Sequence, residues 1–572
     1  MINESIDINL LNSYRQNNEN FINDLNGLDL LGKINLLSNY FIYLEDLCLN
    51  YLELNSTFEL VLKKYCNDKS IVNGLLKLFY KLSLTLNGKK VLINFHELLV
   101  QFYYNFNGNE NKEIVLNLLI KLSLSNNGDN DNVHLVDRIE DDLINSVSVT
   151  NENFNFNEIN LESLTLLSLD YKFCLKLFKN HKFLISLVNL KVDEQNQKLS
   201  LLNIYKNLLV YPKNLNETEV QIDKLKKFSN NQKDENESKL YLNFASANER
   251  NELLITLGLC NNLSHLVKNS SLNNRRLLSV CYLFLTNNVK TRNILLSQGI
   301  IKSLLIIIFK LPTQLEFDDL CSIQALAKLT ITTIPTILYP PPLSNTSLSF
   351  IKPFILLLSN QSSTQLQQFE SLLALTNVSS LGMEQSEVIS TIDHNAILTL
   401  TENLLLSNHY QLQRGSIELI CNLITFSPTA FDHWSNEHHL RSNKIQLLLA
   451  LCDDDFEPIR LASSGTLAQL TMTSDTVSKF LLKDSKRLLK ILINLLNDDS
   501  FQLIHRALSI LCSISSSCKT LDDQSLEIIN SSNLMSTLTS LISKLKDNCE
   551  LLDLLRTSLI NLKSLGVNIT NQ

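Results

Sequence analysis

The segment Ser371-Leu-Leu-Ala-Leu-Thr-Asn377-Val378 decides the fold, because related segments recur along the 572-residue chain at a nearly constant interval. The pattern is a mainly apolar run, then a polar residue, then an apolar one. The clearest copies end, in chain order, at Leu285, Leu329, Val378, Leu423, Leu470 and Ile514, at steps of 44, 49, 45, 47 and 44 residues. A period of about 40–47 residues is typical of armadillo and HEAT repeats.

Repeats of this length consist of two or three short helices that cannot bury their own apolar faces, so neighbours stack into a continuous core. The composition agrees: 44% of the residues are hydrophobic, whereas only 12 Gly and 9 Pro are present to form tight turns. The sequence therefore predicts an all-α fold, an armadillo/HEAT-like α-solenoid superhelix. An irregular helical protein with chance similarities is the alternative.

Two polar stretches interrupt the repeats. Residues 217–239 are dense in Lys, Glu, Asn and Gln, which predicts a charged linker or insertion over 213–240. It would separate an N-terminal and central helical repeat region, 1–212, from a repeat domain over 241–572. Residues 128–142 hold six acidic residues and one arginine, which predicts an exposed loop.

Five of the nine prolines lie between Pro335 and Pro353. Proline lacks a backbone donor and clashes with the preceding helical turn, so we expect the segment 335–342 to be an extended excursion from the solenoid. Its apolar and preordered character suggests a loop that positions or binds a partner, and an inert connection is the alternative. The residues of this possible positioning loop are Tyr339, Pro340, Pro341 and Pro342.

Charge, cysteines and hydropathy exclude several classes of protein. The net charge of −8 is unlike that of a nucleic-acid-binding protein, which usually carries a basic excess. The 11 cysteines show no Cys-x-x-Cys pair and predict reduced thiols in a cytoplasmic protein. The most apolar run, Leu304–Phe309, is too short to span a membrane.

No motif of an enzyme is found: the chain has no phosphate loop, dinucleotide signature, zincin motif or nucleophile elbow. His433, His438 and His439 lack the spacing of a complete metal-ligand set, and a loop between helices is the preferred interpretation. Asp453–Asp455 lack the calcium-loop pattern and suggest a turn at a helix boundary. We therefore expect no catalytic site, metal or cofactor.

Recognition of a partner at the protein surface is the class of function that remains. Residues four apart share a helix face, so counting back from the polar position of successive repeats gives one face per repeat. On the last helix of each repeat this face would line the concave side and form a ladder of polar and mixed side chains, suited to an extended peptide. The predicted groove residues are Phe369, Leu373, Asn377, Arg414, Glu418, Asn422 and Gln469.

Each of these residues also has a structural interpretation. Asn377 and Asn422 are residues that cap helices or bridge them to their neighbours. Arg414 and Glu418 are spaced to pair with one another at i and i+4. The apolar pair at 369 and 373 fits a core as well as a site.

Several segments in this order resemble the UCS domain of myosin-directed chaperones. They are Ala325-Leu-Ala-Lys-Leu-Thr-Ile-Thr-Thr-Ile-Pro335, Phe354-Ile-Leu-Leu-Leu, Phe369-Glu-Ser-Leu-Leu-Ala-Leu-Thr-Asn377, Leu412-Gln-Arg-Gly-Ser-Ile-Glu-Leu-Ile-Cys-Asn-Leu423, Lys444-Ile-Gln-Leu-Leu-Leu-Ala-Leu-Cys452 and Leu467-Ala-Gln-Leu-Thr471. The match is clear from Ala325 to Leu482, within 241–572, and weak elsewhere.

The resemblance implies a solenoid that binds the myosin motor domain and supports its folding, stability and work on actin, without a nucleotide of its own. It maps the client groove onto the predicted ladder, although Gly465 and Gln469 stand where a strict repeat would have a bulkier residue and an asparagine. No 34-residue repeat is found at the N-terminus, as in the fungal form without a tetratricopeptide module, so recruitment of Hsp90 stays open. Homo-oligomer formation also stays open.

The alternative function is that of a generic armadillo-repeat adaptor that binds extended peptide segments. A nuclear-import receptor would carry tryptophans beside the ladder asparagines, but Leu373 and Glu418 occupy those positions, and the single Trp434 lies outside the ladder.

Overall fold

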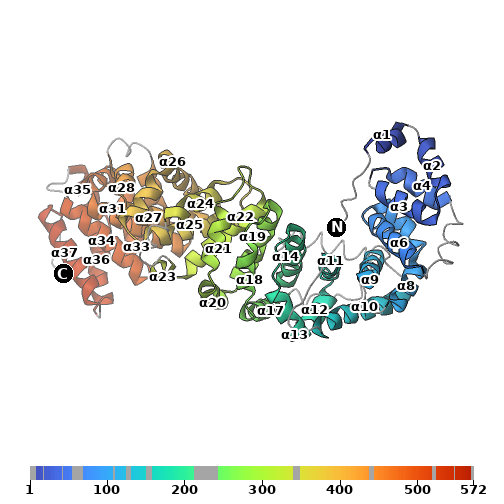
Figure 1. Cartoon of the computed structure of the whole chain (residues 1–572). Helices are drawn as coiled ribbons and strands as arrows, with labels where there is room; N and C mark the ends of the chain where they lie inside the picture. The colour runs from blue at the N-terminus through green and yellow to red at the C-terminus, as the bar shows by residue number, and fades with distance from the viewer. Residues whose placement is uncertain are drawn as a thin grey trace. The chain divides into compact units, whose positions relative to one another are not determined.

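The computed structural model describes residues 8–16, 18–41, 43–54, 68–106, 110–123, 130–149, 158–211, 243–338, 348–436, 443–517, 523–546 and 548–567. Over these residues the chain forms helices, joined by short turns, and contains no strand. It divides into two compact units, Met1–Ile300 and Ile301–Gln572 (Figure 1).

The first unit begins with short helices. They are α1 (Ile8–Gln16), α2 (Asn18–Gly27), α3 (Leu30–Tyr40), α4 (Glu45–Leu54), α6 (Lys69–Leu82), α7 (Leu86–Ile93), α8 (His96–Asn105), α9 (Glu110–Ser123), α10 (Asn130–Val149) and α11 (Glu158–Leu167). The unit continues with α12 (Tyr171–Lys179), α13 (His181–Asn189), α14 (Gln195–Leu209), α17 (Phe244–Thr256), α18 (Leu259–Leu266), α19 (Leu272–Asn287), the 3₁₀ helix η1 (Val289–Thr291) and α20 (Arg292–Ser297).

Helix α21 (Ile300–Ile308) begins at the boundary. The second unit contains α22 (Phe317–Thr332), α23 (Pro335–Leu338), α24 (Leu348–Ser359), α25 (Gln365–Ser379), α26 (Met383–Leu404), α27 (Tyr410–Phe426), α28 (Pro428–Ser435), α30 (Lys444–Leu451), α31 (Glu457–Thr473), α32 (Asp475–Leu482), α33 (Ser485–Leu496), α34 (Phe501–Ser517), α35 (Asp523–Ser531), α36 (Leu534–Lys544) and α37 (Cys549–Ser564).

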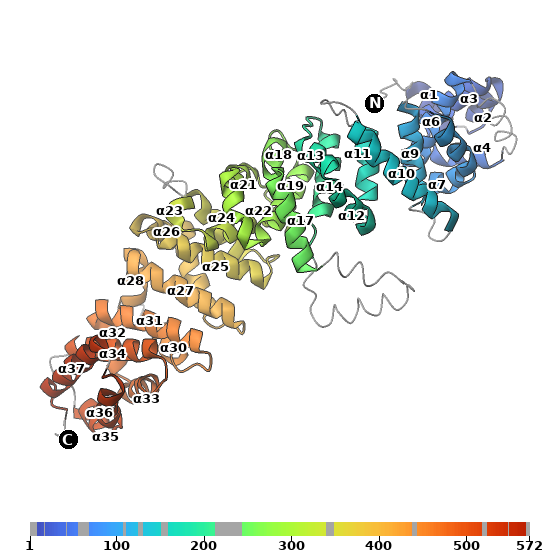
Figure 2. The ribbon, with the colours of Figure 1, turned by 90° about the horizontal axis from the view of Figure 1, so that it is seen from below.

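In the second unit, one long helix of each repeat packs against the same helix of the next repeat, in the order α22, α25, α27, α31, α34 and α37. We call these six the ladder helices; Figure 2 shows this unit from below. They run parallel, since contacts join the first half of one helix to the first half of the next and the second half to the second half. Gln367 thus donates to Gln324 at 3.1 Å, whereas Asn377 donates to Thr330. The repeat period read from the sequence is therefore the spacing of packed helices.

Side-chain caps explain where ladder helix α25 begins. The Thr364 hydroxyl accepts from the backbone N–H of Gln367, and the Gln367 side chain accepts from the backbone N–H of Thr364 in return. This capping box satisfies two of the donors that the first turn of a helix leaves unpaired. The polar break 359–364 lies at the expected boundary between α24 and α25.

The apolar face of each ladder helix is buried against the other helices of its repeat and the next repeat. Leu372, Leu375 and Val378 of α25 are fully buried, as are Leu467 and Leu470 of α31. Burying such a side chain contributes about 1.5–3 kcal/mol, so the continuous core stabilises the stack. The fold class predicted from the sequence is confirmed.

The exposed loop expected over 128–142 is wrong for residues 130–142, which lie in α10. Val136, Ile139 and Leu143 recur at helical spacing, and the last two are buried. Lys176 of α12 pairs with Asp137 of α10 at 2.7 Å and also with Glu140. The high density of acidic residues suggested a loop, but the segment forms an amphipathic helix.

The extended excursion expected over 335–342 is wrong for Pro335–Leu338, which form the short helix α23. Proline is tolerated in the first turn of a helix, because the N–H it lacks has no intrahelical partner there. Tyr339, Pro340, Pro341 and Pro342 lie outside the described residues, as does the expected linker 213–240. The domain boundaries predicted from the sequence stay a prediction.

In the described parts of the chain, no single helix is long and apolar enough to cross a membrane. Taken together, Val289–Ser297 and Ile300–Ile308, which are bent by 85°, have the length and composition of a membrane span. The described cysteines are free thiols. Burial raises the pKa of Cys281 and of Cys452 to about 12, which keeps both protonated and unreactive.

Candidate functional site

The predicted groove residues lie together on three neighbouring ladder helices, α25, α27 and α31. Each is at least partly exposed, whereas the residue that follows each of them in the sequence is buried. We call this surface the ladder face and define it by Phe369, Leu373, Asn377, Arg414, Glu418, Asn422, Leu461, Gly465 and Gln469. Because these positions repeat every four residues on packed, parallel helices, they form one continuous surface.

Asn377 joins its helix to the previous ladder helix. Its amide nitrogen donates to the backbone oxygens of Thr330 at 3.0 Å and Ile331 at 3.1 Å, near the C-terminal end of α22. Carbonyls in the last turn of a helix have no intrahelical partner, so this side chain satisfies acceptors that would otherwise need water. The side-chain amide oxygen of Asn377, Oδ1, receives no hydrogen bond from a described residue.

Asn422 repeats this arrangement one repeat later. Its amide nitrogen donates to the backbone oxygen of Thr376 at 3.0 Å, in the last turn of α25. Both asparagines thus bridge neighbouring helices, which is one of the two roles that the sequence left open. Their partly exposed positions leave the amide oxygens able to accept from a bound backbone, so the binding role stays a prediction.

Arg414 and Glu418 pair with one another at 2.7 Å across one turn of α27. Both side chains are partly exposed, and such a surface pair contributes about 0.3–0.5 kcal/mol. The pair therefore does little for stability and leaves two charged groups at the middle of the ladder face.

Gly415 of α27 faces α25, and the space beside it would hold a Cβ at ordinary van der Waals distance. A Cβ at this position would lie 3.4 Å from Leu372 and 3.5 Å from the ring of Phe369. The ring lies against the glycine on one side and is partly exposed on the other. Phe369 is therefore a packing residue that also offers apolar surface to a ligand.

Gly465 and Arg506 form a contact that sequence reasoning missed. A Cβ at Gly465 would lie 3.1 Å from the guanidinium carbon of Arg506 on α34. The Nη1 atom of Arg506 is buried and has no hydrogen-bond partner among the described residues. Arg506 also lines an open polar pocket of about 330 Å³ with His505 and Glu550. The glycine thus makes room for a cation at the far end of the ladder face.

A polar cluster lies beside the ladder face between α22 and α25. Glu370 accepts from Gln324 at 2.8 Å and pairs with Lys328 at 2.6 Å, and both members of the ion pair are largely buried. Removing one partner of such a pair is costly, because the other charge stays buried. This cluster fixes the relative position of two ladder helices.

Among the residues considered as metal ligands, His433 has another partner. His433 bonds Glu402 at 2.6 Å, and His438 and His439 lie outside the described residues. Asp453–Asp455 lie between α30 and α31, at the expected helix boundary. Within the described ranges there is no group of three or more His, Cys, Asp or Glu side chains that could hold a metal ion.

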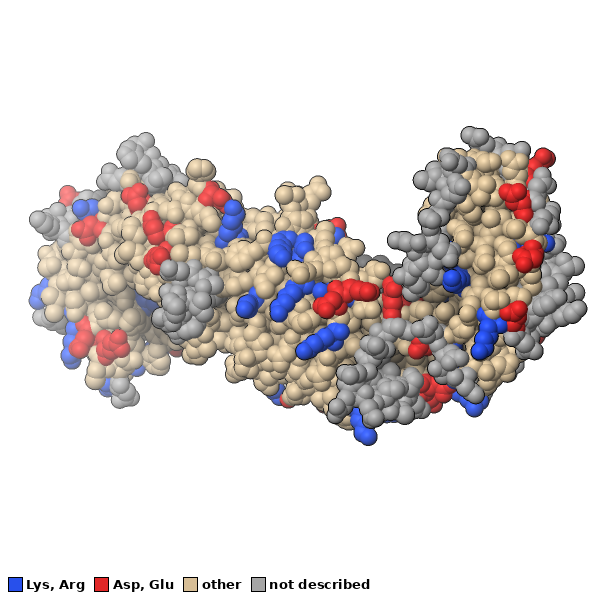
Figure 3. Space-filling view, viewed as in Figure 1, with Lys and Arg blue, Asp and Glu red and all other residues tan. Residues whose placement is uncertain are grey.

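Charge is mixed over the molecular face shown in Figure 3, where lysine and arginine side chains are interspersed with acidic ones. A protein that binds nucleic acid through its phosphates needs a basic surface. The ladder face itself carries one arginine and one glutamate, which pair. Its chemistry is therefore that of amides and apolar groups.

Comparison with known proteins identifies the relatives of this chain. No family model matches it. The protein unc-45 homolog B of Danio rerio is 28% identical over 302 residues, which are 52% of this chain and 30% of that protein. Ring assembly protein 3 of Schizosaccharomyces pombe is 28% identical over 207 residues, which are 35% of this chain and 26% of that protein.

Its homologues are UNC-45 proteins of the UCS family. The resemblance seen in the sequence is thereby confirmed. The chain spans less than a third of the length of the curated relatives it matches. No tetratricopeptide segment is found in the described part of this chain.

Solved structures show the same fold. UNC-45 from Drosophila melanogaster matches with a TM-score of 0.67 and 20% identity, over 98% of this chain and 70% of that one. She4p matches with a TM-score of 0.74 and 19% identity, over 97% of this chain and 74% of that one. The myosin chaperone UNC-45 from C. elegans, solved with an Hsp90 peptide, matches with a TM-score of 0.69 and 16% identity, over 97% of this chain and 58% of that one.

Proposed function

We propose that this chain is a myosin-directed chaperone, and that the ladder face is the groove that binds an extended segment of the motor domain. The observation that carries the proposal is the continuous, partly exposed ladder face, on a fold shared with a protein described as a myosin chaperone. The domain we assign to this task is 241–572. The proposal implies a cytoplasmic protein with no catalytic step.

The binding chemistry follows from the side chains of the ladder face. The amide oxygens of Asn377 and Asn422 accept backbone N–H groups of the client, and Gln469, which has no side-chain partner among the described residues, both donates and accepts. Phe369 and Leu373 cover apolar client side chains. The client segment is thereby kept from aggregating until it packs into the folded motor.

No nucleotide is needed for this mechanism. Each chaperone molecule binds one client molecule, and the client is released as it folds. Hsp90 is a second candidate partner, since the related C. elegans protein was solved with an Hsp90 peptide. Whether this chain recruits Hsp90 and whether it forms homo-oligomers are separate questions that a pull-down and sedimentation answer.

The test is protection of a heat-stressed myosin motor domain, followed by light scattering. We expect the intact chain to suppress aggregation at an equimolar ratio and the double variant Asn377→Ala plus Asn422→Ala to lose most of this protection. Absence of protection by the intact chain would contradict the proposal. Equal protection of an unrelated aggregating protein would favour the generic adaptor instead.

A matched control separates binding from stability. Asn251 of α17 is fully buried and bridges to the backbone oxygen of Leu209 at 3.4 Å, so it does the bridging task without an exposed face. Asn251→Ala should lower the melting temperature but keep the protection. If both variants lose protection in proportion to their melting temperatures, the ladder asparagines are bridges alone.

A further inference from the structure

A row of large apolar side chains marks one edge of the second unit, at the N-terminal ends of the ladder helices, about one helix turn beyond the ladder face. Five successive ladder helices each have one at their N-terminal end, at steps of 49, 44, 46 and 45 residues. Each is about half exposed: Phe317 52%, Leu366 51%, Tyr410 46%, Phe456 54% and Phe501 51%. We call these five residues the apolar edge.

The apolar edge is continuous because the ladder helices are packed and parallel, so their N-terminal ends lie side by side. Tyr410 and Phe456, from neighbouring helices, stack with ring centroids 5.4 Å apart and planes within 10°. His409 in turn stacks on Tyr410 at 5.9 Å. The rings of Tyr410 and Phe456 are thus ordered against one another, while each side chain stays about half exposed.

Helix formation does not require these side chains. The N-terminal positions of helices favour Ser, Thr, Asp and Asn, and Phe456 occupies the N-cap of α31 without any side-chain cap. Single exposed apolar residues are common, but a regular row of them costs solvation at every repeat. Aromatic residues held in this way are typical of protein interfaces.

Carboxylates flank the aromatic rings. Two of the five positions read Glu316-Phe317-Asp318 and Asp455-Phe456-Glu457, and Phe501 follows the aspartates 498 and 499. Acidic residues are common at helix N-termini because their negative charge interacts favourably with the helix dipole. The dipole explains the carboxylates at these positions, but it does not explain the aromatic rings between them.

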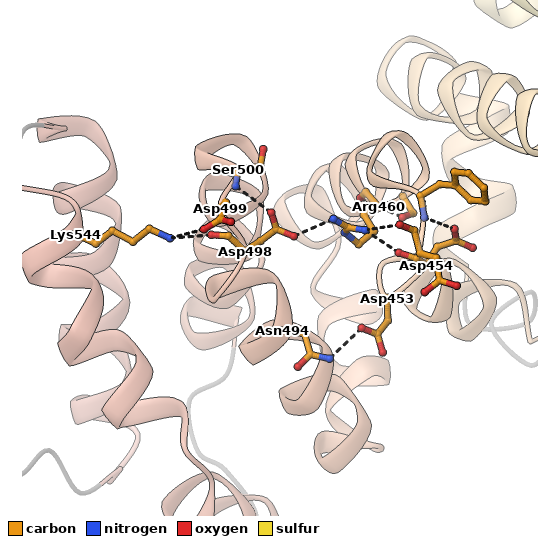
Figure 4. A network of polar contacts seen from close by, with 11 residues as sticks. Asp453, Asp454, Arg460, Asn494, Asp498, Asp499, Ser500 and Lys544 are labelled. Atoms are coloured by element: carbon orange, nitrogen blue, oxygen red, sulfur yellow. Dashed lines mark hydrogen bonds and ion pairs between the residues drawn. The ribbon is translucent and has the colours of Figure 1, made fainter.

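Some of these carboxylates are already neutralised. Figure 4 shows Arg460 pairing with Asp498 at 3.0 Å and Lys544 approaching Asp499 at 3.9 Å. The carboxylates of Asp455 and Glu457, beside the stacked rings, form no ion pair with a described residue, although Arg460 donates to the backbone oxygen of Asp455 at 3.0 Å. The edge near Phe456 therefore combines half-exposed aromatic rings with two carboxylates that are not in ion pairs.

We propose that the apolar edge is a second docking surface, adjoining the ladder face at the N-terminal ends of its helices, and that it binds a cationic segment carrying arginine or lysine beside apolar side chains. The guanidinium or ammonium group lies between a carboxylate and the face of Tyr410 or Phe456, where cation–π attraction adds to ion pairing. The apolar side chains of the segment cover the remaining surface of the edge.

The test uses the full chain and three short fluorescein-labelled peptides that alternate leucine with arginine, with glutamate or with glutamine. We expect the arginine peptide alone to bind, measured by fluorescence anisotropy, and its affinity to fall as salt is raised from about 0.05 to 0.5 M. Equal binding of all three peptides would show unspecific apolar adhesion and overturn the proposal.

Variants locate the site. Tyr410→Ser plus Phe456→Ser should weaken binding of the arginine peptide by roughly tenfold or more, and serine is a favoured N-cap residue for α31. The matched control, Phe426→Ser plus Met472→Ser, removes exposed apolar side chains from the opposite ends of the same two helices and should leave affinity within about twofold. Equal loss in both variants would overturn the assignment.

Two further measurements exclude other occupants. Asp455→Asn plus Glu457→Gln should weaken the arginine peptide and lessen its salt dependence, whereas an unchanged affinity would contradict the role of charge. Sedimentation of the chain alone tests whether the apolar edge binds a second copy of the chain. Self-association that is lost in the variant Tyr410→Ser plus Phe456→Ser would overturn the proposal of a cationic partner.

Protection of myosin by that variant should stay intact. This result would show that the apolar edge and the ladder face bind separately.

Discussion

Asparagine amides join neighbouring helices in both units, but they do so at different depths. In the first unit Asn262 is buried and donates to the backbone oxygens of Val188 at 2.6 Å and Leu190 at 2.7 Å. In the second unit Asn377 and Asn422 make the same kind of bond from partly exposed positions. The comparison shows that an asparagine bridge between helices can also bind a partner only where its side chain reaches the surface.

The largest expected effect on stability is at the buried asparagine of this comparison, Asn262. Asn262→Ala leaves two backbone oxygens buried without a donor, so we expect a loss of about 2–3 kcal/mol in unfolding free energy. Urea unfolding followed by circular dichroism measures it. A loss below about 0.5 kcal/mol would mean that water replaces the amide and that depth does not matter.

The exposed side should lose less. Asn422→Ala removes one bond to Thr376 at a site open to water, and the expected cost is about 0.5–1 kcal/mol. Binding of the myosin motor domain, measured by pull-down, should fall more than this stability loss explains. Asn422→Asp, which keeps the acceptor, should retain part of the binding; if it behaves as alanine does, the acceptor role is wrong.

A smaller effect is expected at the far end of the ladder face. Gly465→Ala places a Cβ about 3.1 Å from the flexible end of Arg506, which moves at little cost. We expect a stability change within about 0.5 kcal/mol, because only a flexible side-chain end has to shift, and a measurable change in client affinity. An unchanged affinity, with Arg506→Gln unchanged as well, would remove this end from the binding surface.

The smallest effect is on the pH dependence of stability. Burial alone would raise the pKa of Glu402, but the hydrogen bond with His433 and the charge of Lys444 lower it below its usual value. A lowered pKa in the folded state means that the stabilisation is complete above the unfolded pKa, about 4.3, and is lost as the pH falls through the folded pKa.

The pH prediction is checked with Glu402→Gln. The difference in unfolding free energy between the native chain and this variant should be constant near neutral pH and shrink below about pH 4. A difference that stays constant down to the lowest pH at which the chain folds would show that Glu402 contributes through shape and not through charge.

The sequence predicted the repeat period, the ladder helices and the residues of the ladder face, because all three follow from the helical spacing of apolar positions. It failed at α10, where acidic residues concealed buried Ile139 and Leu143. It also failed at Pro335, where proline begins a helix and does not break one.

The spacing of residues in the sequence could not predict which side chains touch between repeats. Nothing in the sequence shows that Gly465 faces Arg506, 41 residues later, because the contact depends on how two helices pack. The apolar edge, in contrast, left a signal: one large apolar residue at the start of five of the six ladder helices, in register with the repeats. Aligning the repeats by helix start, and not by their apolar ends, would have found it.

The most direct test of the central claim is photocrosslinking from the ladder face. A benzoylphenylalanine residue at Gln469 should crosslink to the myosin motor domain, and the crosslinked client segment can be identified by mass spectrometry. The same group at exposed Lys490 on α33 should give no crosslink. Crosslinking from Lys490 and not from Gln469 would contradict the account.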